Sequence, residues 1–259
     1  MRICYFGTYE KDYPRNRVII QGLKKAGVEV TECHIPLWEK KKDKTKWSFF
    51  DKISLALKLP FIYIRLAINF RKLDRKNNFD CMIVGYIGQL DMLIAHLIAK
   101  KKKIIFNPMI SLYDTLVNDR KIIKNSFLKK LLHWTDRKSC SYADLVVLDT
   151  EKHAGYFRKE FGIKNADVLY IGADEIFKPG KKEKKQQKPG KGRFRVLFYG
   201  KYTPLHGTES IIMTAKLLEN NNDIEFEIIG KGQTYKKDME TAENLDVKNI
   251  EFREWVSYN

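Results

Sequence analysis

The sequence predicts an α/β fold with two Rossmann-like domains, each built on a doubly wound parallel sheet. Three observations support this. Short apolar runs alternate with segments of helical periodicity along most of the 259 residues. Runs such as 143–148 and 196–198 are largely apolar, which is typical of strands that are buried on both faces. A lysine-rich segment, 178–194, interrupts the alternation, and the pattern resumes after it.

The first domain is expected to span residues 1–177. The predicted strands are 2–6, 28–33, 80–84, 103–107, 143–148 and 167–171. The predicted helices are 16–26, 89–99, 121–142 and 151–161. The first helix, for example, places Val18, Ile19 and Leu23 on one face and ends at Gly27. In such folds the ligand crevice lies beyond the carboxyl ends of the strands.

The second domain is expected over 195–259. A strand ends at Gly200, a helix begins at Thr208, and further elements follow. These are a strand at 224–229, a helix at 235–244 and a strand at 249–252. Because this is only the opening half of such a domain, we expect an incomplete second sheet with an open edge.

Composition restricts the class of partner. Apolar residues make up 44% of the chain, so a folded core is expected, and the net charge of +17 favours anionic partners or a solvated basic surface. The sequence carries no recognised nucleic-acid module, so no nucleic-acid partner is predicted. The four cysteines are widely spaced, which predicts reduced buried thiols and no metal site.

The N-terminal residues and the lengths of the apolar runs bear on the cellular location of the protein. Residues 3–6 form a predicted strand and lack the apolar region of a signal peptide. No apolar run approaches the length of a membrane span. We therefore expect a cytoplasmic protein.

Residues 40–75 interleave aromatic side chains with lysines and arginines. On a helix, Lys58, Arg65 and Lys72 would share one face. The apolar Leu57, Phe61, Ile64 and Ile68 would line another. Pro60 is expected to interrupt or open the helix. Two interpretations remain: a peripheral contact with the inner face of the membrane, or an ordinary surface helix packed on the sheet.

The segment after the strand at 196–198 has the features of a phosphate site. A glycine-bounded loop leads into a helix, where backbone N–H groups and the positive helix end attract anions. The predicted donor-phosphate residues are Gly200, Lys201, His206, Gly207 and Thr208. Gly230 and Gly232 follow the next strand and are predicted to form a second donor-binding loop.

Four residues are candidates on the acceptor side. Tyr9, Arg15 and Asn16 lie after the first strand or at the start of the first helix. Asn16 could instead be a plain N-cap, and Arg15 a surface charge. Asp114 follows the strand at 103–107 and is the predicted catalytic group, able to orient an acceptor hydroxyl or accept its proton. Its alternative role is that of a turn or cap aspartate.

Taken together, four segments resemble the GT-B glycosyltransferases, most closely the retaining family called family four. These are the opening strand, loop and helix over 3–30, the strand and cap 143–150, the segment 171–179, and the two glycine-punctuated segments within 200–232. The resemblance implies transfer of a sugar from a nucleotide diphosphate sugar to a glycan or lipid-linked acceptor, with retention and with neither cofactor nor catalytic metal. It also implies that the first domain binds the acceptor and the second the donor.

The sequence departs from this family in two respects. Lys201 and His206 stand where the family has arginine and lysine. The paired glutamates that hold the donor are not reached before Asn259, so the resemblance covers a second domain that is cut short. A fragment, a natural truncation and a split enzyme all remain open. The alternative function is a non-catalytic acceptor-binding half that needs a partner chain.

Overall fold

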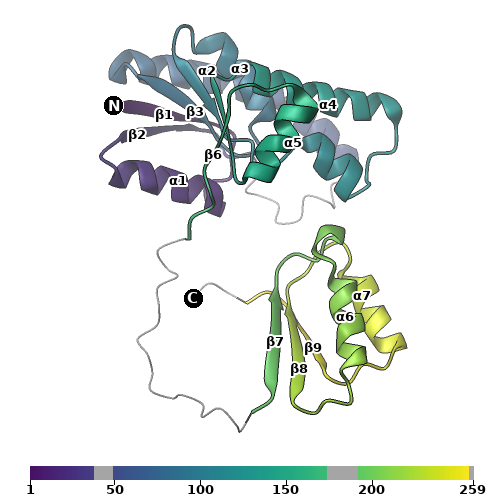
Figure 1. The fold of residues 1–259 in the computed structure, drawn as a ribbon. Coiled ribbons are helices and arrows are strands. Elements are labelled where there is room, and N and C mark those ends of the chain that lie inside the picture. The colour runs from purple at the N-terminus through teal and green to yellow at the C-terminus, as the bar shows by residue number, and fades with distance from the viewer. Residues whose placement is uncertain (38–48, 174–191, 257–259) are drawn as a thin grey trace. The chain divides into compact units, whose positions relative to one another are not determined.

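The computed structural model describes residues 1–37, 49–173 and 192–256 (Figure 1). The chain forms two compact units, which we describe separately. Unit 1 comprises Met1–Val117 and Ile122–Phe177, and unit 2 comprises Asn118–Lys121 and Lys178–Asn259. Most of the predicted linker 178–194 lies outside the described residues.

Unit 1 is built on a six-stranded parallel sheet with the order β2-β1-β3-β4-β5-β6. The strands are β1 (Arg2–Gly7), β2 (Glu29–His34), β3 (Cys81–Val84), β4 (Lys103–Phe106), β5 (Leu145–Leu148) and β6 (Ala166–Val168). Because β2 lies on one side of β1 and β3 on the other, the chain changes its direction of winding between β1 and β3. The carboxyl ends of these two strands are therefore the expected position of a ligand crevice.

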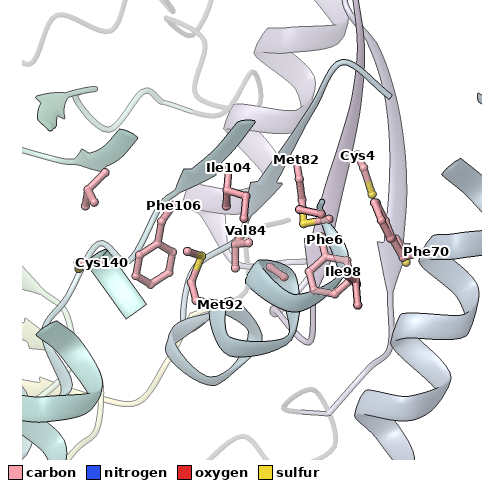
Figure 2. Packing of buried hydrophobic residues seen from close by; sticks show 14 of the residues in the cluster. Cys4, Phe6, Phe70, Met82, Val84, Met92, Ile98, Ile104, Phe106 and Cys140 are labelled. Carbon is pink, nitrogen blue, oxygen red and sulfur yellow. The ribbon is translucent and has the colours of Figure 1, made fainter. Parts of the chain in front are cut away.

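Five α-helices cover this sheet: α1 (Pro14–Lys25), α2 (Phe49–Asn77), α3 (Gln89–Ile98), α4 (Ser126–Ser141) and α5 (Glu151–Phe161). Helix α1 packs on one face, through a cluster that includes Ile3, Ile20 and Ile83. Helices α2 to α5 cover the other face (Figure 1). Figure 2 shows the larger core there, in which Phe6, Val84 and other sheet residues contact the helices.

Most of the predicted elements are confirmed, with three differences. Helix α2 is continuous through Pro60, so the predicted interruption is wrong; the proline removes one backbone hydrogen bond, which a helix of 29 residues tolerates. The helix predicted over 121–142 begins only at Ser126, because the side chain of Asn125 caps it by accepting a 3.1 Å bond from the N–H of Leu128. Strand β6 is shorter than predicted.

Unit 2 holds a three-stranded parallel sheet with the order β7-β8-β9. Its elements are β7 (Phe194–Tyr199), a 3₁₀ turn (Pro204–His206), α6 (Thr208–Leu217), β8 (Ile224–Ile229), α7 (Tyr235–Asn244) and β9 (Ile250–Arg253). Residues of α6 and α7 form one core with the sheet, centred on Ile212, Ile228 and Ala242. On the opposite face Leu197 and Tyr199 of β7 are 53% and 77% exposed, so the described helices cover only one face.

Candidate functional site

The two predicted glycine loops of unit 2 lie against each other. The N–H of Gly200 donates a 3.0 Å hydrogen bond to the carbonyl of Ile229, and the N–H of Tyr202 donates one of 3.3 Å to Lys231. Tyr202 and Gly232 also form a β-bridge. The loops that follow β7 and β8 therefore form one layer at the carboxyl end of the sheet.

Glycine is required at 230 and 232 by backbone packing. A β-carbon on Gly230 would lie 1.9 Å from the carbonyl oxygen of Gly200, and one on Gly232 would lie 2.4 Å from that of Tyr202. Gly230 also has φ of +137°, which L-residues rarely adopt. Close contact between the two loops accounts for both glycines in this structure, without a ligand.

Lys201 and His206 lie on the solvent side of this layer, and both are exposed. The Nδ1 of His206 is 2.5 Å from the carbonyl oxygen of Lys201. Because a carbonyl only accepts, Nδ1 must donate this bond. A neutral His206 ring then presents Nε2 as an acceptor, and it gains a donor for an anion only when it is protonated.

The turn into α6 uses Gly207, whose φ is +60°. The hydroxyl of Thr208 donates a 2.5 Å bond to Asp238 of α7, and the hydroxyl of Thr234 donates a second bond, of 2.7 Å, to the same carboxylate oxygen. Thr208 therefore has only its backbone N–H left for a ligand. Within the described residues, neither this N–H nor that of Glu209 makes a hydrogen bond, so the helix end offers free donors.

In unit 1, Asn16 is not an N-cap. Helix α1 begins one residue after Tyr13, whose side chain makes no capping bond. The Oδ1 of Asn16 accepts bonds of 2.9 Å from the Tyr5 hydroxyl and from the N–H of Tyr86, and its Nδ2 donates to the carbonyl of Glu10 at 2.9 Å. Asn16 thus joins the loops after β1 and β3, so the N-cap interpretation is wrong.

Arg15 is not a surface charge, since it is only 2% exposed. Its Nε donates a 3.0 Å bond to Asn107 and its Nη1 a 2.5 Å bond to the carbonyl of Leu169. Burial lowers the pKa of its guanidinium. The side chain connects α1 with the carboxyl ends of β4 and β6.

Tyr9 is fully buried, and its hydroxyl donates a 3.0 Å bond to Glu32. Burial raises the pKa of this hydroxyl. Tyr9, Arg15 and Asn16, three of the residues predicted on the acceptor side, are therefore buried and hydrogen-bonded to other residues of unit 1.

Asp91 was not predicted from the sequence, although an aspartate in a first helical turn is a recognisable signal. It lies in the first turn of α3 and is 1% exposed. Its Oδ2 accepts a 2.7 Å bond from the N–H of Thr8, and its Oδ1 accepts a 3.0 Å bond from the Thr8 hydroxyl. Burial raises the pKa of Asp91 to about 6, although the bonds from Thr8 lower it. Asp91 thus fixes the loop after β1.

Asp114 is half-buried at the start of a π-helix, Asp114–Asp119. Its N–H donates a 2.9 Å bond to the Ser111 hydroxyl, which in turn donates a 2.8 Å bond to Asp136 of α4. The carboxylate of Asp136 also accepts a 2.8 Å bond from the N–H of Tyr113, and burial raises its pKa. Asp136, which sequence reasoning missed, therefore positions the segment that carries Asp114.

Among the described residues, no group of three or more histidine, cysteine, aspartate or glutamate side chains is placed to hold a metal ion. None of their helices combines the length and apolar character needed to cross a bilayer.

No protein-family model matches this sequence, and no curated protein sequence matches it. Solved structures do match. Sucrose-phosphate synthase from Thermosynechococcus elongatus is similar over 99% of this chain and 71% of its own, with a TM-score of 0.67 and 12% identity. The lipopolysaccharide outer core galactosyltransferase WaaB is similar over 99% of this chain and 69% of its own, with a TM-score of 0.57 and 15% identity.

A third match is Anabaena HepE in complex with UDP and glucose. It is similar over 100% of this chain and 70% of its own, with a TM-score of 0.54 and 12% identity. Because the sequence identities are so low, these structural similarities establish the fold alone. The chain has the GT-B fold, an α/β architecture in which each of two Rossmann-like units is built on a parallel sheet and the second is the smaller.

Proposed function

We propose that this chain is a glycosyltransferase of the retaining family four type, which transfers a sugar from a nucleotide diphosphate sugar to a glycan or lipid-linked acceptor. The observation that carries the proposal is the loop between β7 and α6. There Lys201 and His206 are exposed, and within the described residues the N–H groups of Thr208 and Glu209 in the first turn of α6 make no hydrogen bond. A cationic side chain such as that of Lys201 and a helix N-terminus are groups that bind phosphates.

The chemistry follows from where charge develops. The bond between the anomeric carbon and the diphosphate breaks, the acceptor oxygen forms the new bond, and the acceptor hydroxyl releases its proton. Negative charge then gathers on the departing diphosphate, where donors held in place lower the barrier. In this proposal Asp114 orients the acceptor hydroxyl or takes its proton.

Similar solved structures support the donor class. HepE was solved with UDP and glucose, and WaaB is named a galactosyltransferase of the lipopolysaccharide outer core. We carry the nucleotide diphosphate sugar over to this chain as a proposal.

The test is nucleotide binding to the full chain by calorimetry, with UDP and GDP as probes. At least one of them should bind, and Lys201→Ala should weaken it about tenfold, since a charge-assisted bond is lost. Lys236→Ala is the matched control, because Lys236 is a 92% exposed lysine on α7. Binding of neither nucleotide, or equal losses in both variants, would count against the proposal.

A second candidate is a non-catalytic half that binds the acceptor and needs a partner chain. The uncovered face of unit 2 favours it, because parallel sheets are normally covered on both faces. Strand β7 is also an edge strand of the described three-stranded sheet, so its outer side pairs with no other strand there. On this hypothesis the purified chain releases no sugar from any donor until the partner is added. Leu197→Asp should then abolish the sugar transfer that the partner restores, without lowering the melting temperature of the chain alone.

A further inference from the structure

Helix α2 is apolar on two opposite faces. Leu66 and Phe70 lie in the core, with exposures of 0% and 1%. The exposed set on the other side is Leu57, Phe61, Ile64 and Ile68, at 68%, 75%, 58% and 46%. Their spacing of four, three and four residues places them in one stripe. A surface helix normally has one apolar face, so this second stripe requires a separate explanation.

The charges around this stripe have one sign. From 54 to 77 the helix carries six basic residues and a single acidic one, Asp74. Asp74 pairs with Lys102 at 3.0 Å, so its charge is already matched. Lys58, Arg65 and Lys72 follow one edge of the stripe, and all three are exposed. The surface is therefore apolar along its centre and cationic along its margin.

Helix α4 is built in the same way. Thr135, Asp136, Ser139 and Cys140 are buried on one side. The exposed stripe opposite to them is Phe127, Leu131 and Trp134, at 70%, 45% and 48%. Its neighbours are Lys130, Arg137 and Lys138, and the helix has no acidic residue other than the buried Asp136. Two helices that are far apart in the sequence thus share one unusual composition.

Both helices belong to one layer of unit 1. Helix α3 packs against α2 on one side and against α4 on the other, and all three cover the face of the sheet opposite to α1 (Figure 1). Leu97 of α3 is 74% exposed, which adds an apolar side chain between the two stripes. We call the exposed side of α2, α3 and α4 the basic helical face.

We propose that the basic helical face binds the surface of an anionic lipid bilayer. Exposed Phe, Trp, Leu and Ile side chains insert at the boundary between headgroups and acyl chains, while lysine and arginine contact anionic headgroups. The charge complementarity favours a bilayer over a second copy of this face, which would bring two cationic surfaces together. The proposal does not depend on the donor site.

The test is sedimentation of the full chain with lipid vesicles. We expect binding to vesicles that contain one quarter phosphatidylglycerol, and binding at least tenfold weaker to pure phosphatidylcholine. Raising the salt concentration should weaken the anionic binding, since exposed charges are screened. Equal binding to both vesicles, or binding to neither, would overturn the proposal.

Variants locate the contact. Phe61→Ser and Ile64→Ser on α2 should each reduce the partition coefficient onto anionic vesicles several-fold. The double variant should reduce it about tenfold or more. The matched control is Met213→Ser with Leu217→Ser, since both residues are exposed on α6 of unit 2. A control that lowers binding as much as the α2 pair would contradict the proposal.

A second pair tests whether α4 contributes. Phe127→Ser with Trp134→Ser should also weaken vesicle binding, and should leave the melting temperature unchanged because both side chains are exposed. If the wild-type chain is instead a dimer in sedimentation velocity and either pair makes it a monomer without altering vesicle binding, the face is a protein interface and the lipid proposal fails.

Discussion

The carbonyl oxygen of Gly200 lies 1.9 Å from the position that a β-carbon on Gly230 would take. The two residues directly follow neighbouring strands, β7 and β8, so the two loops of the candidate donor site pack against each other at this point. The loop that carries Lys201 can therefore keep its shape only while residue 230 lacks a side chain.

We predict that Gly230→Ala destabilises unit 2 by about 2 kcal/mol or more, because it combines a steric clash with an unfavourable φ. Hydrogen exchange of β7 and β8 would measure this. Gly155→Ala is the control, since Gly155 lies in helix α5 with no atom within 4 Å of an added β-carbon. That change should stabilise α5 by up to about 1 kcal/mol. If Gly230→Ala proved no more destabilising to unit 2 than Gly155→Ala is to unit 1, the contact between Gly200 and Gly230 would not be tight.

His206 should contribute less to nucleoside diphosphate binding than Lys201 does. The Nδ1 of His206 is occupied by the carbonyl of Lys201, so a neutral ring presents only the acceptor Nε2 to a phosphate. Calorimetry should show that His206→Gln weakens binding by about threefold or less, against about tenfold for Lys201→Ala. A larger loss in His206→Gln than in Lys201→Ala would contradict this arrangement.

Stability should depend on pH through Asp91. Burial raises the pKa of this carboxyl to about 6 from 3.8, so the folded state favours the protonated form. Stability contributed by this group is highest below pH 4 and falls by roughly 3 kcal/mol as the pH rises to 6, where the buried carboxylate ionises. Urea unfolding of Asp91→Asn should lack this decline, so its profile should diverge from the wild type between these values.

Asp114→Asn should lower kcat by about a hundredfold or more and leave nucleotide binding unchanged, if Asp114 acts on the acceptor hydroxyl. Asp119→Asn is the matched control at the other end of the same π-helix. Steady-state kinetics with a donor and acceptor pair would separate them. Similar losses in both variants would indicate a structural role for the segment.

Much of the fold could be predicted because local signals agree with it. Helix α5 has the predicted bounds, since Thr150 caps it by accepting a 3.2 Å bond from His153 and Gly162 ends it with φ of +69°. Strand β8 and helix α7 also have the predicted bounds. Helix α5 and strand β8 are each followed by a glycine, Gly162 and Gly230, which is a recognisable end signal in the sequence.

The buried polar contacts could not be predicted, because their partners are distant in the sequence. Asp91 binds Thr8 across 83 residues, and Arg15 reaches Leu169 across 154. A charged side chain near a helix start is usually exposed, so only the assembled sheet reveals that Arg15 is buried. The same holds for Asp238, whose role depends on the position of Thr208 on another helix.

The positions of the thiols give an internal reporter. Cys4, Cys33, Cys81 and Cys140 are all buried, all belong to unit 1, and are the only cysteines in the sequence. A thiol reagent should therefore leave the native protein unlabelled and modify it only as fast as unit 1 opens. Unit 2 would remain silent in that assay, so the opening rate of one unit can be measured without interference from the other.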